Sequence, residues 1–123
     1  MQQTEGVSIN LREKEITAGQ DVHGKITISY AGRFDTVVIN SQIEYSNAIF
    51  NFKSLNGKSI NYPYARLSIF KNELEDKQNL VFTAATSFVP PHGSFDAKFR
   101  VAIVQEHKEV ASDVGYIKIL ARQ

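Results

Sequence analysis

The sequence predicts an all-β protein, an immunoglobulin-like antiparallel β-sandwich, and three observations lead to that prediction. Apolar and polar residues alternate with a period of two over several short segments, as they do in strands with one buried face. Glycine, proline, asparagine and aspartate separate these segments. No segment carries an apolar stripe with the 3.6-residue period of a packed helix. Two half-buried sheets cover each other most simply by packing face to face.

The clearest strand follows a turn over residues 18–21, where Gly19 can adopt a positive φ angle at little cost. Over residues 22–30, apolar residues and glycine alternate with polar residues, so that Ile26 and Ile28 share one face. We expect this strand to bury that face against a second sheet.

The same alternation predicts strands before and after this one. They cover residues 7–11, 36–46, 66–71, 80–88, 98–103 and 114–120. The run over residues 36–46 is long and typical of a central strand. We expect a polar connector over residues 72–79 and a charged hairpin loop over residues 105–113. Gly115 predicts a bulge or a close approach of another strand.

Residues 49–64 predict a β-hairpin around Asn56-Gly57, the strongest short-range turn signal in the sequence. A two-residue loop would place Phe52 opposite the polar Asn61. A three-residue loop that includes Leu55 instead gives each aromatic residue an apolar partner, Phe52 with Ile60 and Phe50 with Tyr62. We therefore expect the three-residue loop, with Gly57 in the left-handed conformation and a bulge beside it.

Length and composition suit one domain, which covers residues 1–123. The chain has no cysteine, which excludes disulfides, thiolate catalysis and cysteine-bound metals and favours a reducing compartment. The N-terminus lacks the pattern of a secretion signal, and no apolar stretch approaches the ~20 residues of a membrane-spanning helix. We therefore expect a cytoplasmic protein without a transmembrane segment. A formal net charge of +1 predicts no nucleic-acid partner, while peripheral contact with a membrane stays open.

The sequence contains no pattern typical of catalysis or of cofactor binding. His23, His92 and His107 lie far apart and lack carboxylates at metal-binding spacings, so we interpret them as solvent-facing side chains. There is no Gly-x-Ser-x-Gly motif and no glycine-rich phosphate loop. We expect neither an enzyme nor a cofactor or metal site.

Basic residues on the polar faces of the strands are the first candidate binding site, namely His23, Lys25, Lys98, Arg100 and Lys118. If their strands share one sheet, these residues form a single basic stripe that could meet acidic peptide, phosphate or lipid head groups. The simpler interpretation, which we favour, is a solvated face on which acidic residues such as Glu44 are interspersed.

A sheet edge is the second candidate, because unpaired backbone groups can accept an added peptide strand. Residues 7–11 and the strand that contains Pro63 are the expected edges, since proline cannot donate a ladder hydrogen bond. The alternative interpretation is that Pro63 and the charges over residues 12–15 only protect these edges from aggregation.

Several motifs also carry a family resemblance. The opening pattern is Ile9-x-Leu11 followed by Ile16-x-Ala18-Gly19-x-x-Val22-x-Gly24-x-Ile26-x-Ile28. Later motifs are Val37-x-Ile39 and the segment that contains Phe88-Val89-Pro90-Pro91 and Gly93-Ser94-Phe95. With these motifs the sequence resembles the N-terminal lobe of the arrestin superfamily over most of its length.

The resemblance implies a non-catalytic cytoplasmic adaptor that binds peptide tails, membrane proteins or scaffolds. Arrestins hold receptor phosphates partly with basic residues just after the first strand, and Arg12 and Lys14 occupy the comparable position. Two departures are evident. Glu13 and Glu15 interrupt the basic residues, and relatives have two lobes where this chain has length for one.

The sequence therefore favours an adaptor that binds a protein or peptide partner through a sheet edge or a basic strand end, with self-association through an edge strand as an option. The candidate residues are Arg12, Lys14, Lys25, Lys98 and Arg100. The alternative is an immunoglobulin-like module that binds carbohydrate or a cell surface. Exposed aromatic platforms would favour this alternative, first of all at Tyr62, Tyr64 and Tyr116.

Overall fold

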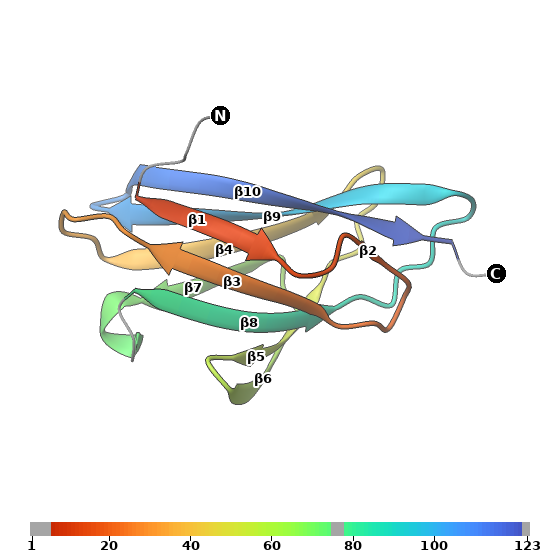
Figure 1. The fold of residues 1–123 in the computed structure, drawn as a ribbon, viewed down its shortest axis with the longest axis horizontal. Coiled ribbons are helices and arrows are strands. Elements are labelled where there is room, and N and C mark those ends of the chain that lie inside the picture. The colour runs from red at the N-terminus through yellow and green to blue at the C-terminus, as the bar shows by residue number, and fades with distance from the viewer. Residues whose placement is uncertain (1–5, 75–77, 122–123) are drawn as a thin grey trace.

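The computed structural model describes residues 6–74 and 78–121, and these residues form two sheets packed face to face (Figure 1). The predicted β-sandwich is therefore confirmed. Sheet A has the strand order β1-β3-β8-β5-β6, and sheet B has the order β2-β10-β9-β4-β7. Neighbouring strands pair antiparallel except β2, which runs parallel to β10. The strands are β1 (Val7–Leu11), β2 (Glu15–Ile16), β3 (Val22–Ile28), β4 (Thr36–Ile43), β5 (Asn51–Leu55), β6 (Lys58–Tyr62), β7 (Arg66–Phe70), β8 (Asn79–Ala85), β9 (Ser94–Gln105) and β10 (Lys108–Leu120).

The topology is immunoglobulin-like on both sheets. The run β1-β3-β8-β5 matches the A-B-E-D order of an immunoglobulin domain, and β10-β9-β4 matches the G-F-C order. The segment between β4 and β8 is the departure, because the chain crosses to sheet A for β5 and β6 and then returns to sheet B for β7. A short 3₁₀ helix, η1 (Lys71–Glu73), follows β7.

Four phenylalanine side chains form the centre of the core. Phe99 of β9 projects from sheet B, and its ring lies 4.7 Å from that of Phe50, 5.4 Å from that of Phe82 and 6.2 Å from that of Phe52. The last two project from sheet A, and all four are fully buried. Rings at these separations pack edge-on or tilted, an arrangement that adds to the stabilisation from apolar burial.

Strand β3 buries Ile26 and Ile28 as predicted, although it ends at Ile28 rather than at residue 30. Gly24 in the same strand lies under the ring of Phe82. A Cβ atom built on Gly24 would lie 2.3 Å from the Phe82 Cζ atom, far inside van der Waals contact. Glycine is therefore required here by the space that the ring occupies.

The hairpin between β5 and β6 corrects the loop prediction. Leu55 pairs with Lys58, so the loop has two residues, Asn56 and Gly57, both with positive φ (50° and 82°). Phe52 pairs with Tyr62 rather than with Ile60, because the register shifts between Phe52 and Ser54. A strand irregularity, and not an extra loop residue, thus gives Phe52 its aromatic partner.

The charged hairpin loop predicted over residues 105–113 is wrong. Strands β9 and β10 pair through this segment, and only Glu106 and His107 form the turn, both with positive φ (50° and 68°). The Glu106 N–H donates a hydrogen bond of 2.8 Å to Asp35 Oδ2, which holds a turn that has neither glycine nor asparagine. The ladder also shifts between Glu109 and Ala111.

The other predicted element boundaries differ less from those in the structure. Strand β4 lies inside sheet B between β9 and β7, in line with the predicted central strand, but it ends at Ile43, and β8 ends at Ala85, before Phe88. The predicted connector over residues 72–79 includes the end of η1 and the start of β8, and residues 75–77 within it lie outside the described residues. Gly115 marks a close approach, because a Cβ atom there would lie 3.1 Å from Leu11 of β1.

We predict that Gly24→Ala destabilises the domain by roughly 1–3 kcal/mol, because the buried Phe82 ring must shift to admit the methyl group. Urea unfolding of the single variants and of Gly24→Ala/Phe82→Leu tests this cause. Phe82→Leu alone should destabilise, but it should cost less in the Gly24→Ala background, since the smaller side chain makes room for the methyl group. Additive effects of the two substitutions would contradict the proposed clash.

Candidate functional site

The structure divides the predicted basic stripe between two sheets. Lys25 lies on the outer face of sheet A, whereas Lys98, Arg100 and Lys118 lie on the outer face of sheet B. The single stripe is therefore wrong, because period-two alternation places a residue on a face without stating which sheet its strand joins. The two faces must be considered separately.

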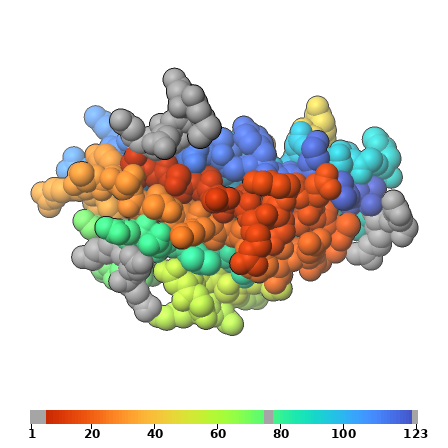
Figure 2. All heavy atoms as spheres, in the orientation of Figure 1, coloured from red at the N-terminus to blue at the C-terminus, as the bar shows by residue number. Residues whose placement is uncertain are grey.

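On sheet A, the pairing of β1 with β3 brings basic side chains together. Asn10 pairs with Lys25, and the backbone N–H of Arg12 donates a 2.9 Å hydrogen bond to the carbonyl oxygen of His23. These side chains lie on the outer face, around a shallow depression of about 410 Å³ that is lined by Asn10, Arg12, His23, Gly24, Lys25 and Val81. Figure 2 views the molecule from this side, with β1 and β3 in red to orange.

Glu13 fixes the corner between β1 and β3. Its Oε1 accepts a 2.7 Å hydrogen bond from the His23 backbone N–H, and its Oε2 lies 2.7 Å from His23 Nδ1. Burial of the carboxylate raises its pKa, but the hydrogen bonds from the backbone and ring of His23 outweigh that effect. The pKa of Glu13 consequently lies below its ordinary value of 4.5.

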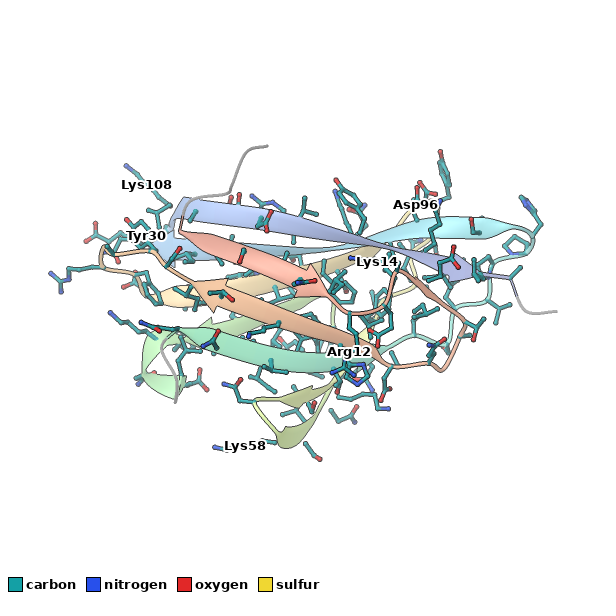
Figure 3. All side chains as sticks on the ribbon, in the orientation of Figure 1. Arg12, Lys14, Tyr30, Lys58, Asp96 and Lys108 are labelled. Carbon is teal, nitrogen blue, oxygen red and sulfur yellow. The ribbon has the colours of Figure 1, made fainter. Side chains whose placement is uncertain are left out.

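Arg12 and Lys25 are exposed and form no ion pair with any residue in the ranges 6–74 and 78–121. By contrast, the nearby Lys53 is paired with Asp21 at 2.7 Å. Lys14 lies in the loop after β1, and its ammonium group donates a 3.3 Å hydrogen bond to the Leu11 carbonyl oxygen. Figure 3 shows Arg12 in front of β3 and β8, and Lys14 in the loop between β1 and β2. On the sheet A face, Arg12 and Lys25 are thus cations without a counter-ion in the part of the chain that the structure describes.

On sheet B, Arg100 is engaged. Its Nη1 donates a 2.9 Å hydrogen bond to Glu109 Oε2, and its Nη2 contacts the other carboxylate oxygen. The bidentate hydrogen bonds raise the pKa of Arg100 and lower the pKa of Glu109. The positive charge of Arg66 also lowers the pKa of Glu109. Arg100 and Glu109 lie in the rows on either side of Ala102, so their side chains meet over it. Ala102 faces outward but is only 2% exposed. Arg100 therefore acts as a structural cover rather than as an available cation.

Lys98 lies in a second depression, of about 260 Å³, on the outer face of sheet B. The depression is lined by Gln42, Glu44, Asp96, Ala97, Lys98 and Tyr116. Of this set, sequence reasoning considered only Lys98 and Tyr116 as binding residues, and it named Glu44 as an acidic residue of a solvated face. The others carry no motif, because their proximity arises from the pairing of β4 with β9.

The three tyrosines considered from sequence differ in exposure. Tyr116 is 63% exposed and Tyr64 is 61% exposed, whereas Tyr62 is half-buried with its ring 5.1 Å from that of Tyr64. Tyr45, which sequence reasoning passed over, is 90% exposed with a φ angle of 56°. A large side chain in this conformation is uncommon and is often associated with function.

The two expected edges are confirmed as the outer strands of sheet A, β1 and β6. The unpaired side of β1 is blocked, because Asp113 Oδ2 of β10 accepts a 2.9 Å hydrogen bond from the Ile9 N–H. Among the described residues, no three histidine or acidic side chains group as metal ligands would, and no helix there is long and apolar enough to cross a bilayer.

Comparisons with known proteins place the chain by fold alone. No protein-family model matches it, and no curated protein matches it significantly. Among solved structures, it is similar to the enterotoxigenic E. coli adhesin CfaE, with a TM-score of 0.63, 11% identity, and coverage of 96% of this chain and 49% of the adhesin. The chain thus spans about half the length of that protein.

Two further structures are similar. The human F-spondin reeler domain has a TM-score of 0.54 and 8% identity, over 95% of this chain and 93% of that domain. The Yersinia pseudotuberculosis adhesin InvE has a TM-score of 0.52 and 9% identity, over 96% of this chain and 32% of the adhesin. At these identities the likeness supports the β-sandwich fold.

We predict that Glu13 stabilises the domain at neutral pH and loses this effect in acid. Its pKa is lower in the folded than in the unfolded state, so its contribution is complete above about pH 5 and disappears as the pH falls through the folded pKa. Urea unfolding should find Glu13→Gln less stable than wild type by roughly 1–2 kcal/mol at pH 7, with the gap closing toward pH 3. Glu15→Gln, two residues further along the chain and exposed in β2, is the control. A gap that stays constant with pH would exclude the carboxylate as its source.

Proposed function

We propose that this domain is a non-catalytic adaptor module that binds an acidic segment of a partner protein on the outer face of sheet A. The observation that carries the proposal is the convergence of Arg12 and Lys25 on one depression without a counter-ion among the described residues. Unpaired cations on one face attract acidic chains and increase their rate of association.

The surroundings of these two cations suit an extended peptide. Asn10 neighbours both cations on the same face, since it pairs with Lys25 and precedes Arg12 by two residues, and it supplies amide donors and acceptors for a peptide backbone. His23 is held in place by Glu13, so that side of the depression is fixed before a partner arrives. A preformed surface loses less conformational entropy on binding.

The face is a better candidate than the edges of sheet A. Asp113 occupies the unpaired side of β1, and Pro63 removes a backbone donor directly after β6. Self-association through an edge strand is therefore a separate, weaker proposal, which sedimentation equilibrium would decide.

The resemblance to arrestins supports an adaptor role in the cytoplasm and adds Lys14 to the binding residues. Lys14 is exposed but turns toward the Leu11 carbonyl oxygen, so we expect it to contribute less than Arg12. The arrestin-like character and the cytoplasmic location, which the absence of cysteine favours, are both part of this proposal.

We predict that the protein binds a fluorescent oligoglutamate peptide and that Arg12→Glu/Lys25→Glu weakens this binding by roughly tenfold or more, because both attractive charges become repulsive. Lys14→Glu should have a smaller effect. Fluorescence anisotropy measures the affinities, and higher ionic strength should weaken binding by the wild type.

Arg33→Glu/Lys108→Glu is the matched control, because it changes the net charge by the same amount and both residues are exposed outside the depression, Arg33 between β3 and β4 and Lys108 at the β9–β10 turn (Figure 3). Its affinity should change much less than that of Arg12→Glu/Lys25→Glu. Equal losses in the two double variants would indicate attraction by net charge alone and would refute a site on sheet A. The same conclusion would follow if a glutamine peptide bound as tightly as the glutamate peptide.

A further inference from the structure

The outer face of sheet B carries a regular array of side chains from three adjacent strands. In one row, Gln42 of β4 pairs with Lys98 of β9, which pairs with Tyr116 of β10. In the next row, the N–H of Glu44 bonds to the Asp96 carbonyl oxygen, and Asp96 pairs with Lys118. Strands lie about 4.8 Å apart and same-face residues about 7 Å apart, so the two rows cover an area on the order of one or two sugar rings.

Tyr116 gives this array an accessible aromatic ring. Its side chain is 63% exposed in the interior of a strand, where an aromatic residue usually packs against a neighbour. No ring contact links it to another described residue, and it borders the depression of about 260 Å³. Much of the Tyr116 side chain is therefore accessible to a ligand.

The array has balanced charge and fixed carboxylates. Lys98 and Lys118 are matched by Glu44 and Asp96, with Lys118 Nζ 3.4 Å from Asp96 Oδ1. Glu44 Oε1 also accepts a 2.8 Å hydrogen bond from the Asp96 N–H, which orients its carboxylate. A face with this balance attracts neither acidic nor basic ligands strongly, unlike the sheet A face with its unpaired cations. The array fits an uncharged polar ligand.

We propose that this array binds a neutral saccharide. A pyranose ring has an apolar C–H face, which can stack on Tyr116, and a rim of hydroxyl groups. The amide of Gln42 and the carboxylate of Glu44 offer donors and acceptors side by side, as adjacent hydroxyl groups require. An apolar surface bordered by a few placed polar groups is the usual composition of a small-molecule site. This site is independent of the proposed binding of an acidic partner on sheet A.

Tyr45 extends the array at the end of β4. It follows Glu44 directly, is 90% exposed, and contacts the ring of Phe95 edge-on at 6.1 Å. Its φ angle of 56° turns it out of the line of the strand. Tyr45 is thus a second exposed ring close to Glu44 in the chain, although it does not line the depression.

An array of neutral and acidic glycans, followed by calorimetry with the soluble neutral oligosaccharides that bind, tests the proposal. We expect binding to neutral glycans, with an affinity about tenfold lower for Tyr116→Ala and within about twofold of wild type for Tyr116→Phe, which keeps the ring. Gln42→Ala should also weaken binding, because it removes hydrogen bonds to hydroxyl groups. Circular dichroism checks that each variant is folded, which we expect because Gln42 and Tyr116 are exposed.

Tyr64→Ala is the matched control, since Tyr64 has nearly the same exposure as Tyr116 but lies between β6 and β7. Its glycan binding should equal that of wild type. Absence of binding to every neutral glycan would overturn the proposal, as would selective binding of acidic glycans. Equal affinity of Tyr116→Ala and wild type would place any saccharide elsewhere. None of these outcomes bears on peptide binding to sheet A.

Discussion

The contact between Phe99 and the three phenylalanines around it holds the two sheets together. Phe99 lies on the central strand β9 and meets Phe50, Phe52 and Phe82 within 4.7–6.2 Å, so its ring fixes both the spacing and the relative position of the sheets. Space for this cluster depends on Gly24, above which the Phe82 ring lies. Because the rings occupy the interior, each strand must turn its polar residues outward, and both candidate binding faces follow from that requirement.

A polar contact closes the sandwich on the side of β1. Asp113 accepts a hydrogen bond from the Ile9 N–H, and Gly115 lets Leu11 approach β10 closely. This contact protects an edge that could otherwise add a foreign strand, since a charged group facing an edge disfavours aggregation. The ladder between β1 and β3 places the end of β1 where Glu13 can reach His23 and where Arg12 and Lys25 border one depression.

The two outer faces differ in how their charged side chains are paired, and this difference is the reason that a different ligand is proposed for each face. On sheet B, Arg100 is bound bidentately by Glu109, and the array has two basic residues, Lys98 and Lys118, and two acidic ones, Glu44 and Asp96. On sheet A, Glu13 is bound to His23, and Arg12 and Lys25 have no ion-pair partner among the described residues. A cation with a fixed partner stabilises the fold, whereas a cation without one is available to a ligand.

The sequence by itself determined the strands, the core and the choice of outward-facing residues, because alternation with a period of two is a local property. It also identified Arg12 and Lys25 as exposed cations. Only the tertiary structure decided which strands share a sheet, and it therefore separated Lys25 from Lys98 and brought Gln42, Glu44 and Asp96 together. It likewise decided the Glu106-His107 turn, where a hydrogen bond from the Glu106 N–H to the Asp35 carboxylate holds a turn without glycine, and the register shift beside Phe52. Pairing joins residues far apart in the chain, and its energy depends on packing that no single segment encodes.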